Sequence, residues 1–154
     1  TMVGIGGEAI SKLPPEIRAI FENPNRSCED AVRFNAFVEV DGSVIPLLEA
    51  IDLSDFPPAE IGFFEAQKRD NLKVAQKAKE ALQRGDLTAA KEELVNLEKR
   101  LVEWEGSKAV PPKEEDKWKY YSEVAKRFGV APRVEKVYFA EVEALRAVET
   151  VCNL

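Results

Sequence analysis

The sequence predicts an all-α protein, a single-domain helical bundle of about five to seven helices around a central antiparallel helical hairpin. The first observation is a run of apolar residues spaced three and four apart, the a/d pattern of a helix that packs along one stripe. Its members are Leu87, Ala90, Leu94, Leu97, Leu101 and Trp104. The second is the preceding Gly85-Asp86 pair, a glycine that ends one helix and an aspartate that caps the next. The third is the length, since 154 residues suit one domain with a sizeable core.

Residues 1–56 are predicted to form an acidic N-terminal segment of short helices. They hold four Lys and Arg residues against ten Asp and Glu, so that they carry the whole net charge of −6. The stretch "LPPEIRAIFENP" predicts one short helix, because Pro15 suits a first turn and Pro24 stops it.

Residues 27–56 are ambiguous between helix and strand. Ser27 suits an N-cap, and apolar residues after it follow helical spacing. We expect two short helices hinged at Gly42, the second opening at Ser43 and running to about Ile51. A small β-hairpin over 37–46 stays open as the alternative, because Asp41-Gly42 suits a type I′ turn, although Pro46 weakens the second strand.

The segment 57–105 is predicted to be the long helical hairpin. Pro57-Pro58 opens its first helix, which runs to about Arg84, and the a/d run forms its second. The seam of two heptads is too short to require an intermolecular coiled coil. We therefore expect it to pack mainly against the preceding helix and the core.

The segment 112–152 is predicted to be a C-terminal helix pair, with one helix over about 113–128 and a second from near Pro132 to about Val151. The corner at 117–139 is similar to a helix-turn-helix, and Gly129 marks its turn. A DNA-reading corner also needs basic flanks, and Lys117, Lys119, Arg133 and Lys136 are the candidates. Glu135 stands where such a second helix would carry its apolar anchor, so we interpret the corner as a structural one.

Composition excludes several classes of chemistry. Histidine is absent, which removes imidazole bases and the Glu-x-x-His pairs of helical di-iron sites. Glu49, Asp52 and Asp55 are the best carboxylate cluster for Mg²⁺, but they also fit a helix end followed by a cap. The sequence therefore predicts no catalytic residues, no cofactor and no metal site.

The two cysteines, Cys28 and Cys152, lie near opposite ends and have no metal-binding spacing. We expect two free thiols that pack as small hydrophobic side chains, and the spacing leaves their pairing open. No apolar run approaches the roughly 20 residues of a spanning helix, so the sequence predicts a cytoplasmic protein without membrane contact. The abundance of Glu and Lys is typical of a thermophile.

These observations favour a non-catalytic protein–protein interaction module, an adaptor or accessory subunit of a larger assembly. The partner is a protein or a second copy, and the candidate partner-binding residues are Leu94, Leu97, Leu101 and Trp104. The alternative is a nucleic-acid-associated factor that docks through the corner at 117–139. A carboxylate-only metal enzyme is the third hypothesis.

Overall fold

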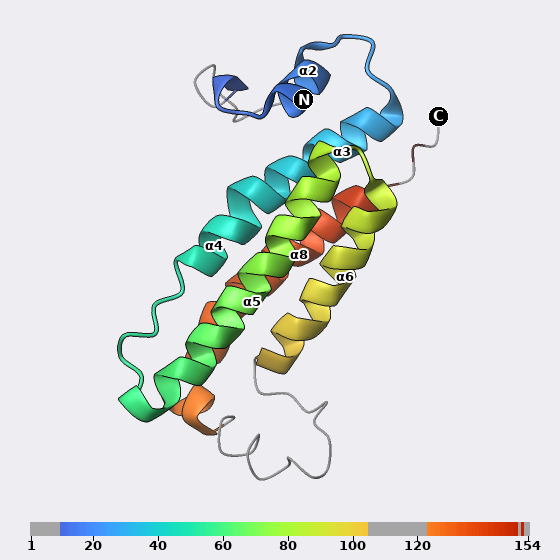
Figure 1. Cartoon of the computed structure of the whole chain (residues 1–154). Helices are drawn as coiled ribbons and strands as arrows, with labels where there is room; N and C mark the ends of the chain where they lie inside the picture. The colour runs from blue at the N-terminus through green and yellow to red at the C-terminus, as the bar shows by residue number, and fades with distance from the viewer. Residues whose placement is uncertain (1–9, 105–122, 151, 153–154) are drawn as a thin grey trace.

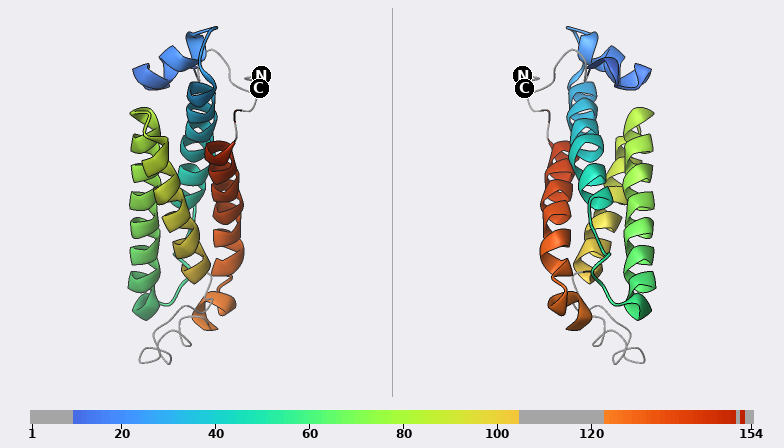
Figure 2. Two further views of the ribbon diagram at one scale, coloured as in Figure 1. Left: turned by 90° about the vertical axis from the view of Figure 1, so that its right-hand side faces the viewer. Right: turned by 90° about the vertical axis from the view of Figure 1, so that its left-hand side faces the viewer.

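A computed structural model describes residues 10–104, 123–150 and 152, and it confirms the all-α bundle (Figure 1). Its elements are α2 (Pro15–Glu22), α3 (Cys28–Glu39), the π-helix η1 (Val40–Val44), α4 (Ile45–Glu49), α5 (Pro58–Gln83), α6 (Leu87–Trp104) and α8 (Val130–Glu149). The long helices α3, α5, α6 and α8 close a ring in which each packs against two neighbours. Adjacent helices in the ring run antiparallel (Figures 1 and 2), the up-and-down arrangement of four-helix bundles.

The hairpin of α5 and α6 is confirmed at the positions that the sequence indicates. Gly85 adopts φ +82°, a left-handed conformation that favours glycine, and the chain reverses there. The amide of Asp86 donates to the Ala81 carbonyl at 2.9 Å, which closes the end of α5. The Asp86 carboxylate then accepts from the amide of Ala89 at 3.0 Å, so it caps α6.

The region 37–46 forms neither the hinge at Gly42 nor the β-hairpin. Instead, α3 continues through η1 into α4, and Gly42 lies inside the π-helix without a positive φ. Phe37, Val40 and Val44 have no exposed surface, so burial along one helical face outweighs the local turn preference. Asp41, the first residue of the expected turn, instead pairs with Lys79 of α5 at 2.8 Å.

Helix α8 begins at Val130, two residues before the predicted start at Pro132. Gly129 adopts φ +68° and its amide donates to the Lys126 carbonyl at 3.2 Å, which ends the preceding turn. Because Val130 has no exposed surface, the apolar stripe of α8 starts there and Pro132 falls within the first turn. Residues 123–127 are helical as predicted, whereas 113–122 lie outside the described residues.

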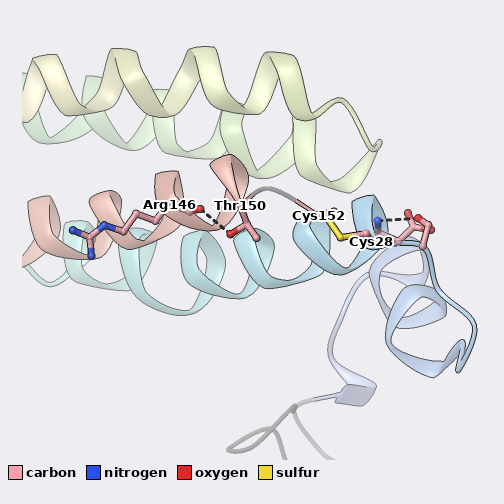
Figure 3. The surroundings of a disulfide bond; sticks show 6 residues. Cys28, Arg146, Thr150 and Cys152 are labelled. Atoms are coloured by element: carbon pink, nitrogen blue, oxygen red, sulfur yellow. Dashed lines mark hydrogen bonds between the residues drawn. A yellow bond between two sulfur atoms is a disulfide. The ribbon is translucent and has the colours of Figure 1, made fainter. Parts of the chain in front are cut away.

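The prediction of two free thiols is wrong, because Cys28 and Cys152 form a disulfide with their Cα atoms 5.7 Å apart (Figure 3). Cys28 begins α3, and Cys152 follows the end of α8. Antiparallel packing of α3 and α8 places these two ends side by side, which sequence spacing alone cannot show. A crosslink across 124 residues stabilises the fold by about 4–5 kcal/mol in a chain-entropy account.

The short helix α2 packs against α3 at the same end of the bundle (Figure 1). Ile17 and Ile20 are buried, and the ring centroids of Phe21 and Phe34 lie 5.5 Å apart. No described helix combines the length with the apolar composition that a transmembrane segment needs.

Arg33 joins α3 to the end of α5. Its guanidinium donates hydrogen bonds to the carbonyl oxygens of Leu82 and Gln83, which lie in the last turn of α5, where regular helical partners run out. The Leu82 carbonyl also accepts from the Gly85 amide at 3.2 Å. A Cβ atom on Gly85 would lie 3.5 Å from the same guanidinium, an ordinary van der Waals contact, so the positive φ rather than lack of space favours glycine there. The fork of the guanidinium thereby fixes the hairpin turn against α3.

We expect Arg33→Ala to lower the free energy of unfolding by about 1.5–3 kcal/mol, because it leaves two partly buried carbonyls without their charged donor. Urea denaturation monitored by circular dichroism measures the change. The matched control is Arg84→Ala, whose side chain is 58% exposed and which should change the free energy by less than about 0.5 kcal/mol. Equal losses in the two variants would contradict the role of Arg33.

Candidate functional site

The segment between α4 and α5 carries the acidic cluster that the sequence singles out. Lys68 of α5 reaches across to it, and its Nζ donates to the carbonyls of Glu49 at 3.0 Å and Ile51 at 2.8 Å. These carbonyls come at the end of α4, where helical partners are missing. Leu53 and Phe56 are buried beneath the segment, so the loop is anchored from α5 and from the core.

Arg133 of α8 holds the other side of this loop. It donates to both carboxylate oxygens of Asp55, at 3.1 and 2.7 Å, and to the carbonyl of Asp52. The guanidinium also lies 5.6 Å from the ring centroid of Phe56, within the range of a cation–π contact. The hydrogen bonds from Arg133 lower the pKa of Asp55, so that this carboxylate stays ionised.

The three acidic residues Glu49, Asp52 and Asp55 do not converge on one point. Asp52 accepts from the amide of Ser54 at 2.9 Å, a turn contact that lowers the pKa of Asp52, and Asp55 faces Arg133. Within the described ranges, no group of three or more His, Cys, Asp or Glu side chains is arranged to hold a metal ion. The cluster therefore serves here as a turn and an ion pair.

A shallow pocket of about 370 Å³ opens between this loop and the first turns of α8. Its apolar wall consists of Leu47, Ala50, Ile51 and Pro132, and its polar rim consists of Asp52, Arg133 and Lys136. Arg133 is already paired with Asp55, whereas Lys136 is exposed to solvent. The pocket can accept an apolar side chain that has an acidic group within reach of Lys136.

Phe139 extends this surface along α8. It is 59% exposed, more than any other large hydrophobic side chain in the described residues. It comes three residues after Lys136, so the two side chains occupy neighbouring positions on one side of the helix. Together, the pocket and Phe139 form what we call the α8 surface, which is defined by the seven pocket residues and Phe139.

The residues that the sequence suggests for binding lie in different places, some inside the bundle and some at its surface. Leu94, Leu97 and Leu101 have no exposed surface and Trp104 is 2% exposed, so this seam packs inside the bundle. A partner cannot reach it while the four helices stay closed. Of the basic candidates, Arg133 and Lys136 line the pocket, and Lys117 and Lys119 lie outside the described residues.

Sequence reasoning missed Phe139 and Glu141, which are two positions apart on α8, the first exposed and the second buried. Phe139 falls off the apolar stripe of its helix, and that offset is the signal that could have marked it as exposed. Glu141 falls on the stripe, four residues after Val137 and three before Ala144, both of which have no exposed surface. A carboxylate at a stripe position is the signal for a buried acid.

Glu141 has no exposed surface, and neither of its carboxylate oxygens has a hydrogen-bond partner among the described residues. Burial, with a smaller contribution from the charge of Glu98 on α6, raises the pKa of Glu141 to about 8. The side chain is therefore protonated at neutral pH, because an unpaired charge in the core is costly.

A second buried polar group, Asn71 of α5, accepts from Arg100 of α6 at 2.7 Å.

Comparison of the chain with protein-family models, with curated proteins and with solved structures gives no match. The candidate site therefore rests on its geometry alone.

We expect the stability of the protein to fall as the pH rises from about 4.5 to about 8. Across this window the folded state keeps the Glu141 proton that the unfolded state has lost, since the pKa is raised from 4.5 to about 8. The slope contributed by this group approaches about 1.4 kcal/mol per pH unit. Urea denaturation at a series of pH values measures it.

Glu141→Gln should remove this part of the slope and give a protein that is more stable than the wild type at pH values above about 8. The matched control is Glu135→Gln on the exposed side of the same helix, which should leave the slope unchanged. A slope that persists in Glu141→Gln would show that Glu141 is not its source.

Proposed function

We propose that the chain is a non-catalytic protein–protein interaction module, an adaptor or accessory subunit, that binds its partner through the α8 surface. The observation that carries the proposal is the exposure of Phe139 beside a pocket with an apolar wall. Exposed aromatic side chains next to apolar pockets are typical of the residues that dominate binding energy at protein interfaces.

The chemistry of the α8 surface indicates what the partner should present. An apolar side chain would fill the wall formed by Leu47, Ile51 and Pro132, and an aromatic or aliphatic side chain would cover Phe139. Lys136 at the rim favours an acidic group nearby. The partner we propose is therefore a protein segment that combines apolar anchors with at least one carboxylate.

The nucleic-acid alternative is less well supported by this geometry. The guanidinium of Arg133 already donates hydrogen bonds to Asp55 and to the Asp52 carbonyl, so it is not a free phosphate ligand. Glu135 and Glu143 are exposed on the same helix and would repel a polyanion. A protein partner needs neither a free Arg133 nor a basic surface.

We propose a cytoplasmic location and a thermophilic source together. Disulfides are rare in the reducing cytosol of mesophiles, but intracellular proteins of hyperthermophiles contain them often. The Cys28–Cys152 bond and the Glu- and Lys-rich composition therefore support one combined hypothesis.

Site-specific photo-crosslinking tests the α8 surface. A photoreactive phenylalanine analogue at position 139 of the full chain should give one predominant protein adduct in a lysate of the source cells. The same analogue at Lys99, which is exposed on α6, is the matched control and should not give that adduct. Unlabelled wild-type chain should compete the adduct away, and Phe139→Ala should compete at least about tenfold less well.

Two outcomes would contradict the proposal. Equal adducts at positions 139 and 99, or equal competition by wild type and Phe139→Ala, would show that the α8 surface is not the binding site. An adduct that disappears on nuclease treatment would favour the nucleic-acid alternative. Circular dichroism of Phe139→Ala should match the wild type, because the replaced side chain lies mainly in solvent.

A further inference from the structure

The Cys28–Cys152 disulfide lies at one end of the bundle, beyond the last turn of α8 (Figure 3). Both cysteines are partly exposed rather than buried in the core. We propose that this bond is a redox latch between Cys152 and the start of α3 and that Cys152 is a thiol–disulfide exchange site. A dithiol reductant opens the bond and releases the start of α3 from Cys152, while the four-helix bundle stays folded. The proposal is independent of the partner-binding function.

The two sulfur atoms have different surroundings, which gives the exchange a direction. Cys28 is the first residue of the twelve-residue helix α3, directly after the N-cap Ser27. Unpaired amides and the helix dipole at such an end stabilise a thiolate. Asp30 opposes this effect, but Arg33 lies 3.9 Å from its carboxylate and offsets part of its charge. Cys152 lies outside any helix, so Cys28 is the better leaving group.

The exchange balances with the dithiol as the reductant. One thiolate of the dithiol attacks Sγ of Cys152 and forms a mixed disulfide, while the Cys28–Cys152 bond breaks and its electron pair leaves on Cys28 as a thiolate. The second thiolate of the dithiol then attacks the reductant's first sulfur, which is bonded to Cys152 in the mixed disulfide. This step closes the disulfide of the reductant and releases Cys152 as a thiolate. The dithiol is oxidised to a disulfide by two electrons, and the two cysteines take up protons according to the pH.

The end of α8 does not depend on the disulfide. The hydroxyl of Thr150 donates to the Arg146 carbonyl at 3.0 Å (Figure 3), and the Thr150 amide donates to the Ala147 carbonyl at 3.4 Å. After these two bonds the backbone leaves the helical conformation at Thr150. The end of the helix is therefore closed by its own residues.

The packing of α3 against α8 also remains when the bond opens. Phe34 and Phe37 of α3 and Val137 and Ala144 of α8 are buried in the same core, which lies along the bundle rather than at its end. Loss of the crosslink lowers the unfolding midpoint, because it frees the unfolded chain. It removes none of these apolar contacts.

Reduction of the native full chain tests the latch. Dithiothreitol without denaturant, followed by iodoacetamide, should leave both cysteines alkylated and the far-ultraviolet circular dichroism unchanged. Hydrogen exchange should become fast in the first turn of α3. Peptides that contain Leu97 or Val137, both fully buried, should stay protected, with only the moderate acceleration that follows from the lower global stability.

The direction of exchange is tested with a limiting amount of reduced glutathione, a monothiol that traps the first step. Peptide mass spectrometry should place the mixed disulfide on Cys152, at least about tenfold more often than on Cys28. The Cys28→Ser, Cys152→Ser double variant is the control. It should show the faster exchange in the first turn of α3 without any reductant and should not respond to dithiothreitol.

Three results would overturn the proposal. A bond that is reduced only in denaturant would be a structural crosslink closed to exchange. Loss of the helical signal or of protection around Leu97 on reduction would show that the bond holds the whole fold. Glutathione found mainly on Cys28 would reverse the direction of attack.

Discussion

The turns of the bundle are held by charged hydrogen bonds to backbone carbonyls where helices end and loops begin, positions at which regular helical partners run out. Three cationic side chains donate these bonds from other helices. Arg33 of α3 reaches the end of α5, Lys68 of α5 reaches the end of α4, and Arg133 of α8 reaches the loop at Asp52. Each contact joins elements that are distant in the sequence. Together they fix where the chain turns relative to its neighbours, a geometry that apolar packing leaves adjustable.

The sequence predicts those features of the fold whose cause is local. The α5–α6 hairpin follows from Gly85, Asp86 and the a/d run, because its turn and its seam are encoded within one stretch. The disulfide and the Arg133–Asp55 pair join residues 124 and 78 positions apart, and both appear only when the ring of helices closes. The prediction for residues 37–46 is wrong for a related reason. Burial of Val40 and Val44 in the shared core outweighs the turn preference of Asp41-Gly42.

The same reasoning explains why the candidate site moved from α6 to α8. A strict a/d pattern marks a helix whose apolar side is fully used, and in α6 the partner for that side is the rest of the chain. The strongest pattern therefore marked the core. Phe139 lies outside the apolar stripe of α8. Such a departure indicates exposure only when it is known which side of the helix faces the core. For this fold, a candidate binding surface can be located only from the structure.

The two features proposed for α8 lie at different parts of the helix. Phe139 and Lys136 belong to its first half, whereas Thr150 and the disulfide follow its end. Phe139 and Thr150 are eleven positions apart, which corresponds to about 16 Å along a helix. In the proposed reduction the buried side of α8 stays in place, so we expect the α8 surface to keep its shape. Coupling between redox state and partner binding requires a partner that also contacts the region around Cys28 and Cys152, because only then do the two states differ in binding energy.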